Sequence, residues 1–219
     1  MYWQKINLLN FDLNDLDFFF ILINKKKYYS NMIFSFIYNK GVFLFIDMLF
    51  LPLKFRFALD RIFFFNIPII VKEEISSDFT IKWVIKLFDN NFIESVYIKH
   101  YERYSLCVSS QVGCSLKCSF CSTGNKGYIR NLVLSEIIGQ FLVCVERIKQ
   151  IFYNKNCCSY IMFNFNYCFS DFVKYYNITN VIFMGMGEPL LNFFVLEKFF
   201  SVINYFKNSN FFSKRIIVS

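Results

Sequence analysis

The sequence is poor in three residue types that interrupt local structure or bind metals: its 219 residues include 3 prolines, 7 glycines and 1 histidine. The histidine is His100, and an apolar stretch separates it from the densest group of cysteines in the chain. A zinc site completed by histidine would therefore need a long reach back along the chain.

A long uninterrupted apolar run is also missing. The longest apolar region, residues 32–53, is broken by Asn39, Lys40, Gly41 and Asp47, whereas a membrane-spanning helix needs about 20 mostly apolar residues. We interpret the region as buried helix, with a membrane segment as the alternative. No cleavable signal peptide is recognised at the start of the chain, so we expect a reducing, cytoplasmic compartment and no membrane, with a plastid-type organelle as the alternative.

Aromatic and basic residues are abundant. The 32 phenylalanines and 14 tyrosines are typical of an AT-rich coding sequence, so most of this excess says nothing about function. A net charge of +8 suits a polyanionic partner, because lysine and arginine release counterions from phosphates. The same coding bias raises the lysine content, and charge alone therefore leaves RNA binding and a solvated helix face as equal alternatives.

Three of the eight cysteines, Cys114, Cys118 and Cys121, form the pattern Cys-x3-Cys-x2-Cys. Soft thiolates select zinc, copper(I) or iron–sulfur clusters, and a closed zinc site needs a fourth ligand nearby. The sequence offers none within reach. Because a [4Fe-4S] cluster held by three cysteines leaves one iron open to an external ligand, the pattern favours a cluster, with inert buried cysteines as the alternative.

This pattern resembles the signature of radical S-adenosylmethionine (SAM) enzymes. Further blocks at residues 106–124, 130–132, 135–140 and 183–192 resemble the RlmN family, the dual-specificity adenine C2-methyltransferases of 23S rRNA and tRNA. The related Cfr-type C8-methyltransferases share the cysteine pattern, but Pro189 and the Arg-Asn-Leu sequence at 130–132 favour the C2 enzymes. Two alternatives stay open: another radical SAM enzyme, such as a Cfr-type enzyme or a maturase, and a zinc-bound RNA-binding module without catalysis.

The resemblance implies cofactors and partners. The cofactors are a [4Fe-4S] cluster and SAM, and the cluster ligands would be Cys114, Cys118 and Cys121. Gly187 and Glu188 match the SAM-binding Gly-Glu element, for which a plain strand-to-helix turn is the alternative, and Ser219 aligns with a serine that contacts SAM. The expected partners are 23S rRNA, tRNA and an electron donor such as flavodoxin or ferredoxin, and a monomer is expected.

Two residues take catalytic roles by resemblance. Glu94 matches the proposed proton acceptor, which removes the C2 proton after a carbon radical adds to adenine; otherwise it is an ordinary strand carboxylate facing water. Cys107 matches the cysteine that resolves the enzyme–RNA adduct through a transient disulfide with a methyl-carrying cysteine; otherwise it is a small buried hydrophobe. The methyl-carrying cysteine would lie beyond residue 219, so we expect a truncated chain that does not turn over alone.

The expected fold class is α/β. Strand, helix, strand, helix and strand alternate after residue 104, which predicts parallel pairing, and places the cysteine loop and the segment after strand 180–184 at the same edge of the sheet. Ser135 is predicted to cap the helix that begins at Leu134. The family resemblance identifies this unit as a partial (β/α)6 radical SAM barrel, truncated after about three strands.

The predicted domain boundaries are 1–68, 69–99 and 100–219. Mixed apolar spacing predicts helices in the first segment, which by resemblance is an RNA-binding accessory domain. Runs of β-branched and aromatic residues predict a short antiparallel β unit in the second. The third is the radical SAM core, with a low-complexity insertion at 154–176 that contains Cys157, Cys158 and Cys168.

Overall fold

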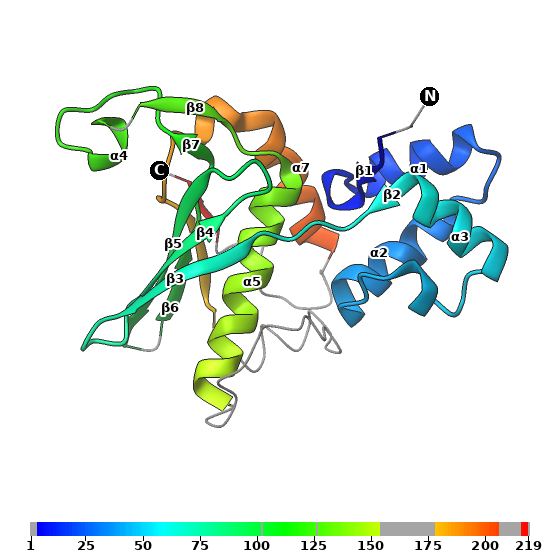
Figure 1. Ribbon diagram of the computed structural model, residues 1–219, viewed down its shortest axis with the longest axis horizontal. Coiled ribbons are helices and arrows are strands. Elements are labelled where there is room, and N and C mark those ends of the chain that lie inside the picture. The colour runs from blue at the N-terminus through cyan, green and yellow to red at the C-terminus, as the bar shows by residue number, and fades with distance from the viewer. Residues whose placement is uncertain (1–3, 102, 126, 154–177, 206–215, 219) are drawn as a thin grey trace.

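The computed structural model describes residues 4–101, 103–125, 127–153, 178–205 and 216–218. Within these residues a helical N-terminal unit lies beside two long helices, which in turn cover a six-stranded sheet (Figure 1). The mixed α/β class is therefore confirmed. The predicted insertion at 154–176, its three cysteines and Ser219 fall outside the described residues.

The N-terminal unit is helical, as the sequence predicts. It consists of β1 (Ile6–Asn7), η1 (Leu8–Asn10), α1 (Leu13–Leu22), α2 (Tyr28–Lys40), η2 (Phe45–Asp47), α3 (Leu53–Ile62) and β2 (Phe63–Phe64). α1 begins with a capping box, in which the Asp12 carboxylate accepts from the Asp15 backbone N–H and the Asp15 carboxylate accepts from that of Asp12. Gly41, the residue after the end of α2, takes the left-handed conformation (φ 64°) that commonly ends a helix.

The interpretation of residues 32–53 as buried helix holds only for α2, up to Lys40. The rest of the region is a loop, η2, a second loop and the first residue of α3, with Leu44, Ile46 and Leu49 exposed. Among the described residues, none of the helices combines the length and the apolar character needed to cross a membrane.

Aromatic packing fills the interior of the helical unit. Phe63 is fully buried, and its ring lies 5.4 Å from that of Phe11 and 4.9 Å from that of Phe19, centroid to centroid. Both pairs meet edge to face, which is a favoured arrangement of aromatic rings. Part of the phenylalanine excess thus serves as core in this unit.

The sheet has the strand order β10-β9-β6-β5-β4-β3. Its strands are β3 (Ile69–Ile75), β4 (Ile81–Lys86), β5 (Phe92–His100), β6 (Arg103–Cys107), β9 (Asn180–Phe183) and β10 (Ile216–Val218). β6 pairs in parallel with β9, and β9 with β10, which confirms the predicted parallel pairing. The antiparallel β3-β4-β5 meander is not detached from them, because β5 pairs with β6. One sheet thus spans the boundary drawn at residue 99, and the three-domain division stays a prediction.

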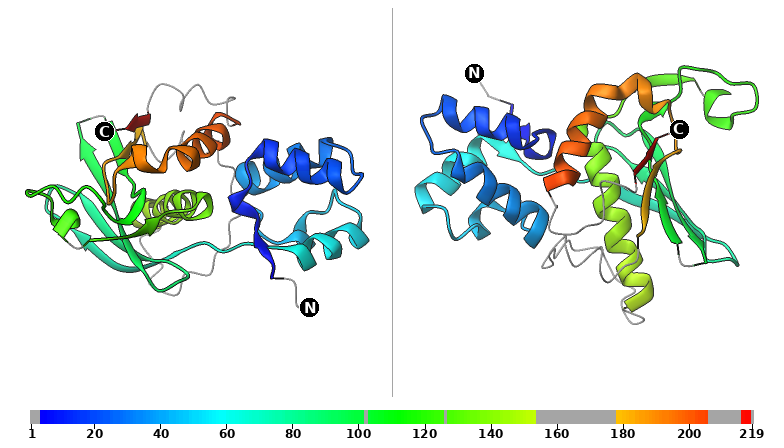
Figure 2. Two further views of the ribbon diagram at one scale, coloured as in Figure 1. Left: turned by 90° about the horizontal axis from the view of Figure 1, so that it is seen from above. Right: turned by 180° about the vertical axis from the view of Figure 1, so that it is seen from behind.

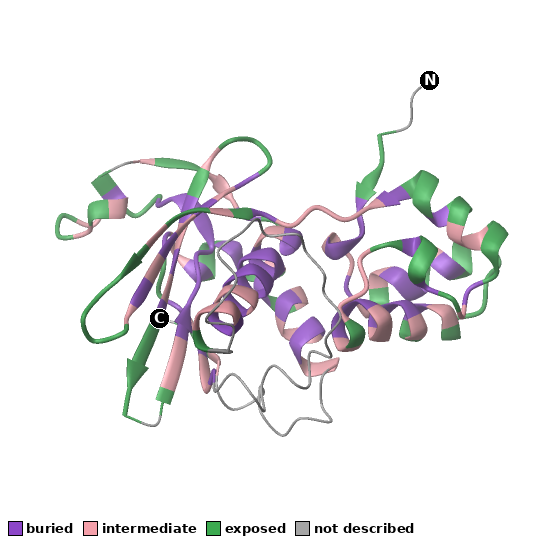
Figure 3. Cartoon of the chain, turned by 60° about the horizontal axis from the view of Figure 1, so that its bottom comes forward, coloured by how far each residue is buried: buried purple, intermediate pink, exposed green. Residues whose placement is uncertain are grey.

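Two helices, α5 (Leu134–Tyr153) and α7 (Phe193–Tyr205), cover one face of the sheet (Figure 2). Along β5, buried Ile93, Ser95 and Tyr97 alternate with more exposed residues. The Ser95 hydroxyl donates to Gln140 of α5 (3.1 Å), which shows that the buried set faces the helix. Buried residues accordingly gather between the sheet and its helices (Figure 3). Glu94 and Val96 belong to the opposite face of the same strand.

The prediction that Ser135 caps α5 is wrong. The helix begins at Leu134, where the carbonyl of Val133 accepts from Glu136 N (3.0 Å) and Ile137 N (3.2 Å). The Glu136 carboxylate accepts from Val133 N (3.0 Å), as in a capping box. The Ser135 N–H donates to Asn10 Oδ1 of η1 (2.9 Å) and so joins the helix to the N-terminal unit.

Candidate functional site

The three-cysteine segment lies in a loop between two short paired strands, β7 (Gln111–Gly113) and β8 (Tyr128–Asn131), and includes the one-turn helix α4 (Ser122–Asn125). Its two ends meet at Gly113 and Gly127. Gly113 has φ +75°, and a Cβ placed on it would lie 1.9 Å from the carbonyl oxygen of Gly127. The Cys114 N–H donates to that same oxygen (3.0 Å). Glycine at 113 is thus required to close the loop.

The three cysteines of this loop differ in their exposure to solvent. Cys114 is buried (8% exposed), whereas Cys118 and Cys121 are half-buried. The backbone N–H of Cys121 donates to the carbonyl of Cys118 (3.0 Å). Three soft sulfur donors on one loop, two of them reachable from outside, suit an iron–sulfur cluster by their chemistry.

Among the residues that the structure describes, no three His, Cys, Asp or Glu side chains are gathered in a metal-binding arrangement, so the ligand assignment stays a prediction. His100 pairs with Arg103, at the opposite end of β6 from Cys107. It therefore lies away from the loop that β6 leads into, which agrees with the expectation that histidine does not complete this site.

The second part of the site is the turn that follows β9, residues 184–188. The Gly185 N–H donates to the carbonyl of Val108 (3.1 Å), and a Cβ on Gly185 would lie 2.7 Å from that oxygen. Glu188 ends the turn, and its carboxylate accepts from Leu190 N (3.2 Å) at the start of η3 (Pro189–Asn192). Glycine at 185 is thus required by packing against the protein, and the SAM-binding assignment of Gly187 and Glu188 stays a prediction beside it.

The turn and the strand leading to the cysteine loop are bonded directly. The backbone N–H groups of Ser110 and Gln111 both donate to the carbonyl of Met186, at 2.8 and 3.2 Å. β6 and β9 are parallel neighbours, so their carboxyl ends meet at one edge of the sheet. The structure therefore brings together the two motifs that the sequence placed at a common edge.

Comparison with known proteins shows which proteins the chain is similar to. No protein-family profile matches the chain. It is 43% identical over 189 residues to the dual-specificity RNA methyltransferase RlmN of Buchnera aphidicola subsp. Cinara cedri, which covers 86% of the chain and 48% of that protein. It is 37% identical over 220 residues to a probable RlmN of Petrotoga mobilis, covering 99% of the chain and 55% of that protein.

Over 86–99% of its own length, the chain is therefore similar to proteins named RlmN. A crystal structure of a radical SAM methyltransferase from Sphaerobacter thermophilus superposes on 97% of the chain with a TM-score of 0.73 and 26% identity, over 56% of its own length. The chain spans about half the length of the RlmN proteins it matches.

The two catalytic candidates suggested by the RlmN resemblance lie on neighbouring strands, β5 and β6. Glu94 belongs to the sheet face opposite α5, and its carboxylate pairs with the Lys82 ammonium of β4 (3.1 Å). Val96 is the register partner of Cys107, so both candidates belong to that same face. Cys107 is 7% exposed, and burial raises the pKa of its thiol. The roles of both residues stay predictions.

The RlmN-like block at 130–132 has a structural role. The Arg130 guanidinium donates to Asp89 in the β4–β5 turn (2.8 and 2.9 Å) and to both carboxylate oxygens of Glu136 (2.8 Å each). The pKa of Arg130 is raised, first by the hydrogen bonds to Glu136 and then by those to Asp89. This fork attaches the hairpin that carries the cysteine loop to both the sheet and α5.

A buried polar network surrounds the junction. Gln140 is fully buried; its Oε1 accepts from Ser109 N (2.8 Å) and its Nε2 donates to Ser109 O (3.0 Å). The Ser109 hydroxyl donates to the Glu94 carbonyl (2.6 Å) and accepts from Met186 N (2.9 Å). Asn192 Nδ2 donates to the carbonyls of Ser110 (2.9 Å) and Leu132 (2.8 Å). In the sequence, the signal that pointed to these polar residues was their position inside the RlmN-like blocks.

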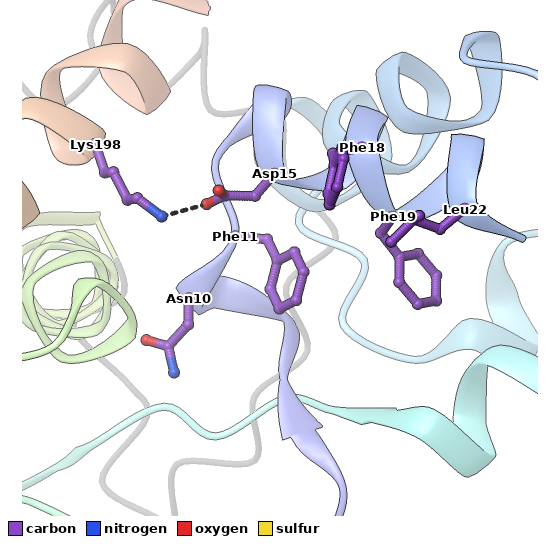
Figure 4. Close-up of a pocket in the computed structure, with 7 residues that line it drawn as sticks. All are labelled: Asn10, Phe11, Asp15, Phe18, Phe19, Leu22 and Lys198. Carbon is purple, nitrogen blue, oxygen red and sulfur yellow. Dashed lines mark hydrogen bonds and ion pairs between the residues drawn. The ribbon is translucent and has the colours of Figure 1, made fainter.

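A separate hollow lies between α1 and α7 (Figure 4). It has a volume of about 330 Å³, and the Lys198 ammonium pairs across it with the Asp15 carboxylate (2.6 Å). Its lining is Asn10, Phe11, Asp15, Phe18, Phe19, Leu22 and Lys198, which includes none of the predicted site residues. The hollow lies where the helical unit meets α7, one of the two helices that cover the sheet.

Proposed function

We propose that this chain forms the cofactor-binding part of a radical SAM methyltransferase that methylates C2 of adenosine in 23S rRNA and tRNA through a methyl-cysteine intermediate. The observation that carries the proposal is the direct bonding of the turn at 184–188 to the strand that leads into the cysteine loop. The RlmN relatives are named as RNA methyltransferases and the structural neighbour as a radical SAM methyltransferase, which supports the reaction class.

The chain's own residues would hold both cofactors. Cys114, Cys118 and Cys121 would ligate the [4Fe-4S] cluster, whose open iron is suited to the amino and carboxylate groups of SAM. Gly187 and Glu188 would bind SAM from the adjoining turn, together with Ser219. When bound, the two cofactors supply the one-electron chemistry that amino-acid side chains lack. The protein's part is to place them and to exclude water.

Glu94 and Cys107 would act on the RNA. The Glu94 carboxylate would accept the C2 proton, and the Lys82 ammonium at 3.1 Å holds that carboxylate in place. Cys107 would resolve the enzyme–RNA adduct by pairing with the methyl-carrying cysteine. Because the two residues share one sheet face, a nucleotide bound over that face would lie near both.

The helical unit, residues 1–68, is the proposed RNA-contacting domain. Lys25 and Lys26 are exposed after α1, while Lys27 pairs with Asp17 (2.8 Å). Exposed lysines gain affinity for phosphates by releasing counterions. An electron donor such as flavodoxin or ferredoxin, a monomeric state and a cytoplasmic location remain predictions.

The first test is cofactor content. The chain reconstituted without oxygen should hold iron and acid-labile sulfide and should bind SAM in equilibrium dialysis. Protein that holds zinc, with neither iron nor sulfide, would contradict the proposal and would favour a zinc-bound RNA-binding module.

The second test is the product. In a chimera, this chain replaces the matched segment of the Buchnera relative, and nucleosides from 23S rRNA and tRNA are analysed by mass spectrometry. We expect 2-methyladenosine; 8-methyladenosine would instead favour a Cfr-type reaction. Glu94→Gln in the chimera should lower product formation by about a hundredfold or more. Glu74→Gln, at an exposed carboxylate on β3, is the matched control.

A further inference from the structure

Gln111 joins the two parts of the proposed site. It is 1% exposed, and it opens the strand β7, which ends one residue before Cys114. Its side-chain Oε1 accepts from the backbone N–H of Glu188 (3.0 Å), and its Nε2 donates to Oδ1 of Asn131 on β8 (2.8 Å). Gln111 therefore bonds to the turn on one side and to the cysteine-loop hairpin on the other.

Gly187 permits this contact. It has φ +100°, and a Cβ placed on it would lie 2.5 Å from Gln111 Cβ and 2.7 Å from both Cγ and the backbone N. The space beside Gly187 is thus filled by Gln111. Val112 and Gly113 alone separate Gln111 from Cys114. The Gln111 side chain therefore adds a link between the Glu188 backbone and the cysteine-loop hairpin, beside the backbone bonds to Met186.

Asn131 fixes the orientation of the Gln111 amide. The Asn131 Nδ2 donates to the carbonyl of Leu191 (2.9 Å), which leaves its Oδ1 to face Gln111. That oxygen accepts from the Tyr128 hydroxyl (3.2 Å) and can accept from Gln111 but not donate to it, so Nε2 of Gln111 turns toward Asn131 and Oε1 toward the Glu188 N–H. Reversing the amide would place two oxygens and two N–H donors against each other.

We propose that Gln111 is a positioning residue for SAM. It holds the backbone of Gly187 and Glu188 at a fixed place relative to the cysteine loop, without touching the reacting atoms. This inference rests on the proposed function, in which SAM binds both to that backbone and to the cluster. A ligand held at two places binds more weakly when either place shifts, because preorganisation is lost.

Two substitutions and a control test the proposal. Gln111→Met keeps the size of the side chain and removes both hydrogen bonds, whereas Gln111→Glu keeps an oxygen for the Glu188 N–H. The control is Asn7→Ala. Asn7 is also a buried amide with one bond as donor, to Asn66 O, and one as acceptor, from Leu9 N, but it lies in the N-terminal unit.

The measurements are iron and sulfide per chain, the dissociation constant of SAM with the reconstituted protein, the thermal midpoint, and amide hydrogen exchange of residues 185–190 without cofactors. Gln111→Met should weaken SAM binding about tenfold, in line with one lost hydrogen bond in a buried site. It should also speed exchange in 185–190 while the iron content stays at the wild-type level. Gln111→Glu should recover part of the SAM affinity. Asn7→Ala should lower the thermal midpoint and leave SAM binding and exchange in 185–190 unchanged.

The outcomes separate the two claims. If the wild-type chain binds SAM and Gln111→Met binds it equally well, the positioning role is wrong and the proposed function stands. Unchanged exchange in 185–190 would also overturn the positioning role, whether or not the variant can be reconstituted. If wild-type protein holds no cluster and no SAM, the proposed function fails and the inference fails with it. Should Gln111→Met not fold, weaker SAM binding or faster exchange in 185–190 of Gln111→Glu, relative to wild type, decides the question.

Discussion

The helical unit and the site region both have buried interiors, but different interactions hold these interiors together. In the helical unit, rings such as Phe63, Phe11 and Phe19 pack edge to face around a core with few polar contacts. Around the site, buried side chains such as Gln140 and Gln111 bond to backbone groups of separate segments. Apolar packing depends on volume and tolerates small shifts, whereas a hydrogen bond fixes distance and direction.

This difference shows where the positions of backbone groups must be held closely. In the proposed function the helical unit presents exposed lysines to RNA, which requires a stable scaffold, and aromatic packing supplies that stability. A site that holds two cofactors against one another needs fixed backbone positions, and satisfied buried amides supply these at the risk of a large loss when one is removed. The predictions below compare the two regions, from the largest effect to the smallest.

Replacing one cysteine of the loop should abolish cofactor binding. Cys118→Ala leaves two thiolates, too few to hold a cluster with one open iron, so iron and acid-labile sulfide per chain should fall to background. Cys144→Ala is the control, since Cys144 is fully buried in α5 and outside the loop. Equal iron in both variants would contradict the assignment of the loop as the ligand set.

Removing a ring from the helical unit should cost stability without affecting the cluster. Phe63→Ala should lower the free energy of unfolding by about 4 kcal/mol, because a fully buried aromatic side chain leaves a cavity. Phe57→Ala, at an exposed ring on α3, should change it by about 0.5 kcal/mol or less. Denaturant unfolding measures both, and iron per folded chain should equal that of wild type. A loss of iron with Phe63→Ala would show that the two regions are not independent.

Removing one amide from the site region should affect both stability and the turn. Gln140→Met leaves the N–H and carbonyl of buried Ser109 without partners, which should cost about 3 kcal/mol of unfolding free energy. Because Ser109 also accepts from Met186 N, hydrogen exchange in residues 185–190 should speed up, unlike in Phe63→Ala. Gln4→Met, at an exposed glutamine, should change neither quantity. If hydrogen exchange in residues 185–190 of Gln140→Met matches that of wild type, the proposed difference between the two regions is wrong.

The smallest effect is a pH dependence at the β3 edge of the sheet, where Glu73 meets Arg147 of α5. Hydrogen bonds from Arg147 lower the pKa of the Glu73 carboxyl, with a further contribution from Trp83 Nε1, while burial opposes them. A carboxyl whose pKa is lowered in the folded state stabilises the protein above its unfolded-state value and loses that contribution as pH falls through the folded-state value. At neutral pH the unfolding free energy of wild type should exceed that of Glu73→Gln by about 1 kcal/mol. The gap should close below about pH 4.

Unfolding free energies measured from pH 7 downward test this dependence, with Glu197→Gln, at an exposed position on α7, as the control. If the difference in unfolding free energy between wild type and Glu73→Gln instead grows as pH falls, the pKa of Glu73 is not lowered in the folded protein.

Local patterns sufficed for much of the fold. The alternation of strand and helix after residue 104 correctly predicted the parallel pairing of β6, β9 and β10, because side-chain periodicity is a property of the element itself. The capping of α5 was predicted wrongly, since Ser135 lies inside a helix that begins at Leu134, and the Glu136 carboxylate accepts from Val133 N at the helix start. The continuity of β5 with β6 was missed because strand pairing is a long-range choice.

By itself the sequence was enough to predict the ligand set, since three thiols at fixed spacing and the RlmN-like blocks can be read without coordinates. What the tertiary structure alone decided is which groups meet. Gly185 and Gly187 are required by Val108 and Gln111, which are remote in sequence, and the Gln111 amide is oriented through Asn131 and Leu191. Hydrogen bonds between distant segments depend on the packed register of strands and turns, and no local pattern encodes that register.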